Sequence, residues 1–385
     1  DAVVGVTDNA AVDAANFDGV DVFDVAFATF GDTISDLEAG ATVRDSLAAT
    51  SITLDDEVTQ RTLELDSNGT LGDYVDASTE ELTVVTTGGD AVLTNLNGGD
   101  GSGTGLQTLN IDADDGNFTL TNKYVTRDSS LEFGTEFELN LQGNGDITST
   151  GGSGIEAGDG ITQMTINANA TGAQTIGEID LRDDGALVDD GQLTIAGSEG
   201  IEANEITEVA LGGTQATDTL NGLTVALDND GGVVLDDLTA TLGHGNEVVL
   251  DSSGGAPNEL SDGSNIAFNK NANNNSSTLT ITGDQDLQIG SNAATALQAA
   301  GIATTDTVTS VLDASNFTGK LTANLKADGT GIAAEDTMQV KLGTGDADLT
   351  LFDAGGGARS TGAAESSFDF QFSADGIGDV EITGF

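Results

Sequence analysis

The chain has 385 residues but no cysteine, no tryptophan and only one proline. The absence of cysteine excludes disulfide bonds, which fits a chain that is exported unfolded or stabilised by metal ions. Aromatic residues make up 4% of the sequence, so Val, Leu, Ile, Ala and Thr must fill the interior. This composition favours a thin, ladder-like core over a bulky globular one.

Basic residues are also scarce, because 10 Lys and Arg stand against 65 Asp and Glu, for a net charge of −55. This equals one uncompensated negative charge per seven residues (385/55). At physiological salt, screening acts over about 8 Å, so closer carboxylates still repel one another. The folded chain is therefore expected to need bound cations or a salty medium. The same charge excludes nucleic acid and anionic lipid as partners.

Long apolar runs and catalytic groups are missing as well. No run approaches the roughly 20 apolar residues of a membrane-spanning helix, so we expect no membrane span. The only histidine, His244, lies in the glycine-flanked string LGHGN, which is typical of a turn. No G-x-S-x-G nucleophile motif is present. We therefore expect that the protein is not an enzyme.

What the sequence does contain is a series of short apolar alternations, separated by corners of Gly, Asp and Asn. Such alternation over a few positions predicts half-buried β-strands. Clear examples are Leu279–Ile281, Leu287–Ile289, Val308–Leu312 and Leu321–Leu325. We predict an all-β fold with a repetitive architecture, either β-solenoid or β-roll-like or a stacked β-sandwich.

Internal echoes support the repetition. The string VLDASNFTG (Val311–Gly319) matches AVDAANFDG (Ala11–Gly19) at Asp, Asn, Phe and Gly. A second echo pairs GIEAGDGITQ (Gly154–Gln163) with GIEANEITE (Gly200–Glu208). Chance similarity in a chain rich in Gly, Asp and Thr is the alternative explanation.

The composition suggests three parts. We predict an N-terminal β assembly region at 1–75, a repetitive β region at 76–260 and a C-terminal β domain at 261–385. Residues 254–277 hold the only proline, Pro257, and an Asn cluster, and they are the best linker candidate. One short helix is predicted at 293–300, because AATALQAA contains strong helix formers and Gly301 can end it.

Calcium is the predicted cofactor, because carboxylates and backbone carbonyls at Gly-rich turns supply the oxygen ligands that it prefers. The candidate loops are 97–103, 112–117, 228–232, 283–286 and 345–348. An Asx-turn without metal requires the same residue types, so each loop has this second interpretation. The candidate metal ligands are Asp100, Asp112, Asp114, Asp115, Asp228, Asp230, Asp284, Asp286, Asp346 and Asp348.

The strings TLTITGDQDLQIG, VLDASNFTGKLTANL and KLGTGDADLTLF resemble the surface-layer and RTX-type β-rich proteins that Gram-negative bacteria export. The resemblance implies a calcium-dependent β-roll or β-solenoid that assembles on the cell surface. The family's G-G-x-G-x-D repeat begins at Gly98, but Gly103 stands where the ligand Asp belongs. This departs from a regular calcium β-roll and leaves isolated calcium sites between strands or at interfaces.

These observations lead to the hypothesis of a structural protein. We expect an extracellular subunit that self-assembles into a lattice or filament at the cell surface, stabilised by calcium, with copies of itself as partners. A cell-surface polysaccharide is a second candidate partner. The alternatives are a virion structural protein (fibre or capsid) of a marine or halophilic host, and an adhesin.

Overall fold

The computed structural model describes most, but not all, of the chain. It divides into two compact units, Asp1–Gly185 and Ala186–Phe385. The described residues are 2–38, 40–55, 60–66, 69–76, 79–97, 106–122, 124–125, 136–149, 154–156, 163–180, 191–209, 222–241, 247–262, 277–292, 294–298, 309–326, 337–352, 367–372 and 379–383.

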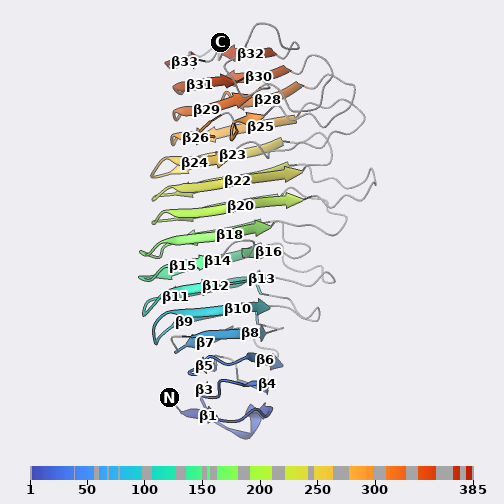
Figure 1. The fold of residues 1–385 in the computed structure, drawn as a ribbon, viewed down its shortest axis with the longest axis vertical. Helices are drawn as coiled ribbons and strands as arrows, with labels where there is room; N and C mark the ends of the chain where they lie inside the picture. Colours follow the sequence, from blue (N-terminus) through green and yellow to red (C-terminus); the bar gives the residue numbers. More distant parts are fainter. Residues whose placement is uncertain are drawn as a thin grey trace, which may run out of the picture. The chain divides into compact units, whose positions relative to one another are not determined.

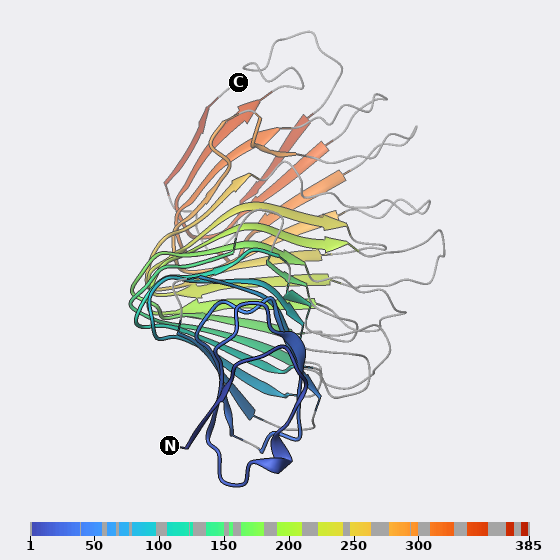
Figure 2. The ribbon, with the colours of Figure 1, turned by 60° about the horizontal axis from the view of Figure 1, so that its bottom comes forward.

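In the first unit, the chain passes back and forth between two parallel sheets, so that each coil adds one rung to each sheet (Figure 1). The first sheet consists, in spatial order, of β1 (Val3–Val6), β3 (Val22–Val25), β5 (Thr42–Asp45), β7 (Gln60–Leu65), β9 (Glu81–Thr86), β11 (Thr108–Ala113), β14 (Glu136–Gly143) and β17 (Gln163–Ala168). The second contains β2 (Val12–Asp13), β4 (Gly31–Ser35), β6 (Ser51–Asp55), β8 (Thr70–Asp76), β10 (Ala91–Asn97), β12 (Phe118–Leu120), β13 (Tyr124–Val125), β15 (Ile147–Ser149), β16 (Gly154–Glu156) and β18 (Gln174–Asp180). A 3₁₀ turn, η1 (Ala14–Asn16), lies in the N-terminal coil and is seen most clearly in Figure 2.

The second unit repeats this plan. Its first sheet consists of β19 (Gly191–Gly197), β21 (Gly222–Asn229), β23 (Glu247–Gly254), β25 (Ser277–Gly283), β28 (Thr309–Ala314), β30 (Thr337–Leu342) and β32 (Ser367–Phe372). Its second sheet contains β20 (Ile201–Val209), β22 (Val233–Thr241), β24 (Asn258–Asp262), β26 (Leu287–Ile289), β27 (Leu297–Gln298), β29 (Leu321–Lys326), β31 (Ala347–Phe352) and β33 (Val380–Thr383). The prediction of an all-β, solenoid-like fold is confirmed.

The core forms because apolar residues at every second position stack into columns that run from coil to coil. In the first unit, Leu63, Val84 and Ile111 are register neighbours on β7, β9 and β11. Their side chains are at most 6% exposed. Burying one such side chain contributes about 1.5–3 kcal/mol, so these aliphatic columns supply the core that the few aromatic residues do not.

Coil length varies, which explains why the repeat is faint in the sequence. Val3 pairs with Val22, an offset of 19 residues (22 − 3). Leu279 pairs with Leu312, an offset of 33 residues (312 − 279). The passage from the first to the second sheet is short by comparison, with three residues between β25 and β26 (284–286). The register is therefore kept at this corner, while the return to the first sheet differs in length.

The prediction of a helix at 293–300 is wrong for the residues that the structure describes there. Leu297 and Gln298 form β27, which pairs in parallel with Leu325 and Lys326 of β29. The preceding turn is closed by the Thr295 hydroxyl, which accepts the Ser291 N–H at 2.9 Å. Burial of Leu297 (3% exposed) under the neighbouring coil outweighs the helix propensity of the alanines.

The described part of the predicted linker 254–277 is also ordered structure, because 258–262 form β24 within the second sheet; residues 263–276 lie outside the described part. The boundaries proposed at 75/76 and 260/261 both fall inside strands, β8 and β24. The three-part division stays a prediction about function. Among the described residues, no helix is long and apolar enough to cross a membrane.

Candidate functional site

The predicted calcium loops share one structural position. Four of the five, 112–117, 228–232, 283–286 and 345–348, lie where the chain turns from the first sheet into the second. The fifth, 97–103, follows β10 on the return side, and Asp100 lies outside the described residues. The sequence pattern therefore predicted the position of four corners. The hydrogen bonds of the corner side chains show their structural role.

In the first unit, the corner side chains form a hydrogen-bonded series that we call the corner ladder. Asp90 Oδ1 accepts the N–H of Asn117 from the next coil at 3.0 Å. Asn117 Oδ1 accepts the N–H of Asp146 at 2.8 Å, and Asp146 Oδ1 accepts the N–H of Ala173 at 2.8 Å. Each corner side chain thereby fixes the backbone of the coil that follows.

The second unit uses the same device with predicted metal ligands. Asp286 Oδ1 accepts the N–H of Lys320 at 2.9 Å, and Asp346 Oδ1 accepts the N–H of Asp379 at 2.8 Å. These two carboxylates therefore have a structural role, but it is a bond to the next coil rather than the local Asx-turn that was the alternative to a metal site. A metal role for them stays a prediction.

Glycine makes this close stacking possible. A Cβ at Gly116 would lie 2.2 Å from the Gly89 carbonyl, and one at Gly145 would lie 2.2 Å from the Gly116 carbonyl oxygen. A Cβ at Gly345 in the second unit would lie 2.1 Å from the Gly319 carbonyl oxygen. The backbone of one corner thus occupies the space that a side chain on the next would need.

Asp112 is a predicted ligand that two other predicted ligands, Asp114 and Asp115, influence. Burial raises the pKa of Asp112, and the negative charges of Asp114 and Asp115 raise it further. Asp112 Oδ1 is a buried oxygen without a hydrogen-bond partner in the described structure. Asp114 Oδ1, in contrast, accepts a hydrogen bond from Asn144 Nδ2 at 3.0 Å.

The remaining predicted ligands lie apart. Asp228 and Asp230 are exposed on either side of the buried Asn229, and Asp284 is exposed at its own corner. Asp348 pairs with Lys320 Nζ at 2.5 Å. Across the described ranges, no three His, Cys, Asp or Glu side chains come together in a group that could hold a metal ion.

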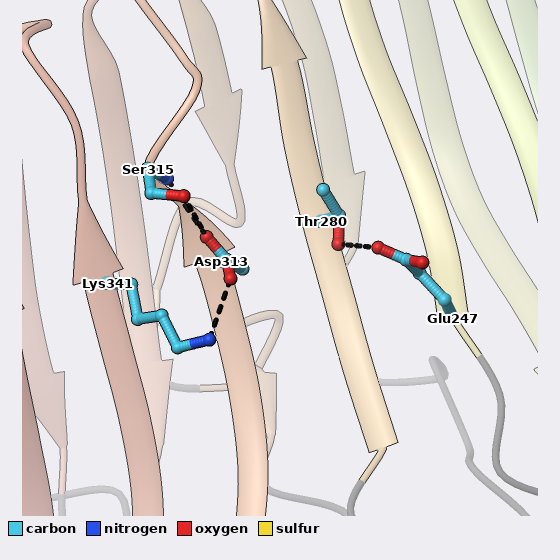
Figure 3. A network of polar contacts seen from close by, with 5 residues as sticks. All are labelled: Glu247, Thr280, Asp313, Ser315 and Lys341. Carbon is cyan, nitrogen blue, oxygen red and sulfur yellow. Dashed lines mark hydrogen bonds and ion pairs between the residues drawn. The ribbon is translucent and has the colours of Figure 1, made fainter.

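A second polar array lies on the outward face of the first sheet in the second unit (Figure 3). Thr280, Asp313 and Lys341 are register neighbours on β25, β28 and β30. Lys341 Nζ lies 2.8 Å from Asp313 Oδ2, and the Ser315 hydroxyl donates to Asp313 Oδ1 at 2.6 Å. Burial raises the pKa of Asp313, but the hydrogen bonds from Lys341 and Ser315 outweigh it and leave the pKa below its usual value.

Hydroxyl donors take the place of cations along the same face. The Thr280 hydroxyl donates to the carboxylate of Glu247 on β23 (Figure 3), and the Thr282 hydroxyl donates to Asp251 Oδ1 at 2.6 Å. Neutral donors stabilise a carboxylate but do not cancel its charge. These hydroxyls therefore hold Glu247 and Asp251 in place without supplying a positive charge.

The first unit has comparable arrays on its first sheet. Asn140 Nδ2 donates to Asn110 Oδ1 at 2.9 Å, and Asn167 Nδ2 donates to Asn140 Oδ1 at 2.7 Å, which links β11, β14 and β17. On β5, Arg44 lies 2.6 Å from Glu64 Oε2 of β7. The hydrogen bond to Glu64 raises the pKa of Arg44, because it favours the charged guanidinium.

Sequence reasoning missed these outward-facing residues because their partners lie far along the chain. Asp313 and Lys341, for example, are 28 residues apart and meet only through strand register. The repeated DA-x-N-F unit was the one signal for Asp313, since its carboxylate caps that turn by accepting the Ser315 N–H at 3.1 Å.

Comparisons with known proteins add no identity. No protein-family model matches the chain, and searches of curated proteins and of solved structures find no match either. The function is therefore inferred from the fold and from the polar arrays described above.

Proposed function

We propose that this protein is a structural building unit of the cell surface, which self-assembles into an extracellular lattice or filament with calcium as a stabilising cation. The observation that carries this proposal is the direction of the polar arrays. The corner ladder, the Asn110–Asn140–Asn167 series and the Glu247–Thr280 and Asp313–Lys341 pairs all connect one coil to the next. Polar side chains that connect successive coils stabilise the fold itself, as expected of a structural protein.

The charge gives calcium its role in the proposal. With a net charge of −55, two copies repel each other, and a divalent cation between carboxylates reduces that repulsion more per ion than sodium does. Asp112 is the predicted ligand that we expect to respond most to calcium, because it has a buried oxygen without a hydrogen-bond partner and is under the influence of the negative charges of Asp114 and Asp115.

Assembly of the purified chain tests the proposal. Sedimentation velocity and negative-stain microscopy are carried out in dilute buffer, in millimolar CaCl₂, and in NaCl of matched ionic strength. We expect polymers in CaCl₂ that dissociate when EGTA is added. Polymers that form equally in matched NaCl would remove calcium from the proposal, and a monomer under all conditions would contradict self-assembly itself.

A further inference from the structure

We propose that the outward face of the second sheet in the first unit binds an uncharged polysaccharide, which lies across the strands from coil to coil. This inference goes beyond the proposed function and does not depend on self-assembly. The surface is one column of outward-facing side chains, which we call the threonine column. Its members are register neighbours on β8, β10, β12, β15 and β18 (Figure 1): Thr70, Val92, Thr119, Thr148 and Thr175.

Every member of the threonine column is uncharged and β-branched, although the chain as a whole has a net charge of −55. Phe118 and Ile147, which precede Thr119 and Thr148, are buried, and side chains alternate along a strand, so the column faces outward. The outward face of the first sheet in this unit instead carries carboxylates such as Glu81. The column offers no charge of either sign and therefore suits an uncharged partner.

The second unit shows that the fold does not require threonine at this position. The threonine column lies two residues after the corner ladder, with Thr119 after Asn117 and Thr148 after Asp146. In the second unit, the residues two positions after the corner are, from coil to coil, Gln288, Thr322, Asp348 and Glu381. Strands at this position tolerate carboxylates, so the strand preference of threonine alone does not explain the uncharged column.

The hydroxyls of the threonine column are open to a partner, whereas polar side chains on the first sheet bond to one another. On the first sheet, for example, Asn140 Nδ2 donates to Asn110 Oδ1 at 2.9 Å. Within the described part of the chain, no hydrogen bond joins the hydroxyl of Thr119, Thr148 or Thr175 to another protein group. A hydroxyl both donates and accepts hydrogen bonds, as the hydroxyls of a sugar do. The column and a polysaccharide are therefore chemically complementary.

The border of the threonine column favours a polysaccharide over a second copy of the same face. Asp90 and Asp146 lie exposed at the corner, two residues before Val92 and Thr148. Each uses Oδ1 to accept a backbone N–H of the next coil. The other carboxylate oxygen can accept a hydrogen bond from a sugar hydroxyl. An identical face would instead bring a second set of carboxylates against these two, which is destabilising.

The spacing of the column determines the kind of polysaccharide that binds. Neighbouring strands lie about 4.8 Å apart, so the five members span about 19 Å (4 × 4.8 Å). Each hydroxyl contributes little alone, and no column member is an aromatic residue that could stack on a sugar ring. Several weak contacts along one polymer add up through multivalency. We therefore expect a long or insoluble polysaccharide to bind and a short oligosaccharide to bind far more weakly.

Co-sedimentation with insoluble polysaccharides tests the inference. The purified chain is mixed with microcrystalline cellulose or chitin at physiological salt in the presence of EGTA, so that the result does not depend on the calcium-dependent polymer of the proposed function. We expect the chain to sediment with at least one of these uncharged polymers and to remain in solution with carboxymethyl cellulose resin, the anionic control. Absence of binding to both uncharged polymers, or equal binding to the anionic resin, would overturn the inference and leave the proposed function standing.

An isosteric pair of substitutions locates the surface. The double variant Thr119→Val/Thr148→Val removes two hydroxyls of the column and keeps the β-branched shape. The matched control is Thr42→Val/Thr62→Val, at half-buried register neighbours on the first sheet of the same unit. We expect the column variant to need about tenfold more polysaccharide for half-maximal binding, because each lost hydrogen bond weakens the contact, and the control to bind as the wild type does.

Circular dichroism should show that both double variants keep the wild-type fold. Equal binding by the column variant and the control would mean that the polysaccharide does not lie on the threonine column. Sedimentation velocity in the same buffer tests the other occupant. A wild-type dimer that the column variant fails to form would identify a second copy as the partner and would overturn the polysaccharide inference.

Discussion

At the scale of single residues, the most unusual group is the carboxyl of Asp45, which is 1% exposed at the end of β5. Its Oδ1 accepts the Ala49 N–H at 3.0 Å, while Oδ2 has no hydrogen-bond partner among the described residues. Burial raises the pKa of Asp45 and outweighs the backbone hydrogen bonds that would lower it, and the negative charge of Asp24 raises it further. The folded state therefore binds this proton more tightly than the unfolded state does.

The sign of the pH dependence follows from this shift. Below the unfolded pKa of about 3.9, the carboxyl is protonated in both states and its contribution to stability is fully present. As pH rises through the folded pKa, that contribution is lost. We predict that Asp45→Asn, which keeps the Oδ1 acceptor, raises the melting temperature at neutral pH and leaves it unchanged well below the unfolded pKa. Thermal unfolding across this pH range measures the difference from the wild type.

The control for this prediction is Asp18→Asn, at an exposed position of the same N-terminal region. It should show little of the effect at any pH, because water already solvates that carboxylate. An equal gain from both substitutions would mean that removal of negative charge in general, rather than burial at Asp45, determines the result.

A corner glycine gives the second prediction at this scale. A Cβ at Gly145 would lie 2.2 Å from Gly116 O, whereas a Cβ at Gly5 meets nothing within 4 Å. Gly145→Ala must shift the stacked backbone and should lower the free energy of unfolding by about 1–3 kcal/mol, as overpacking does. Gly5→Ala, the matched control, should stay within about 0.5 kcal/mol of the wild type. Urea titration of both variants measures this, and equal stabilities would refute the close packing of the corner.

At the scale of elements, the corner ladder predicts a graded response at one position. Asp146 Oδ1 accepts the Ala173 N–H of the next coil at 2.8 Å. Asp146→Ala removes the acceptor and should cost about 1 kcal/mol, whereas Asp146→Asn keeps it and should cost less. Chemical denaturation gives the free energies, and hydrogen exchange at Ala173 should accelerate only in the alanine variant. If the asparagine variant is no better than alanine, the charge matters and the hydrogen bond does not.

Strands and corners are the elements that the sequence predicted best, because both depend on local patterns. Alternation located the strand Leu287–Ile289, which coincides with β26. The Gly and Asp corners marked the passage between sheets, and our interpretation of them as calcium loops stays a prediction. A ladder and a calcium loop need the same small, oxygen-bearing residues, so composition alone could not separate them.

Parallel pairing and the outward-facing arrays could not be predicted, since they depend on register between distant residues. The offset between paired strands changes along the chain, from Val3 and Val22 to Leu279 and Leu312. No fixed period therefore brings Asp313 to Lys341 or Arg44 to Glu64. The prediction of a helix at 293–300 was wrong for a related reason. Helix propensity depends on local sequence alone, and it takes no account of the neighbouring coil that buries Leu297.

At the scale of the whole molecule, the charge of −55 should make stability depend on ionic strength. Apart from the ion pairs of Arg44, Lys320 and Lys341, the carboxylates in the described arrays are stabilised by hydroxyl, amide and backbone N–H donors, which leave the negative charge in place. Screening then reduces repulsion in the folded state more than in the expanded unfolded chain, because the folded carboxylates lie closer together. We predict that the melting temperature rises steadily with NaCl from low to molar concentration.

Melting temperatures measured in CaCl₂ and in NaCl distinguish calcium binding from non-specific screening of charge. If carboxylates such as Asp112 bind calcium, millimolar CaCl₂ should raise the melting temperature more than NaCl of equal ionic strength, and Asp112→Asn should reduce that excess. MgCl₂ is the control, since Mg²⁺ carries the same charge but demands a tighter octahedral geometry. If CaCl₂, MgCl₂ and NaCl act alike at matched ionic strength, the molecule responds to salt alone, and the acidic surface is then an adaptation to a saline medium rather than a set of calcium sites.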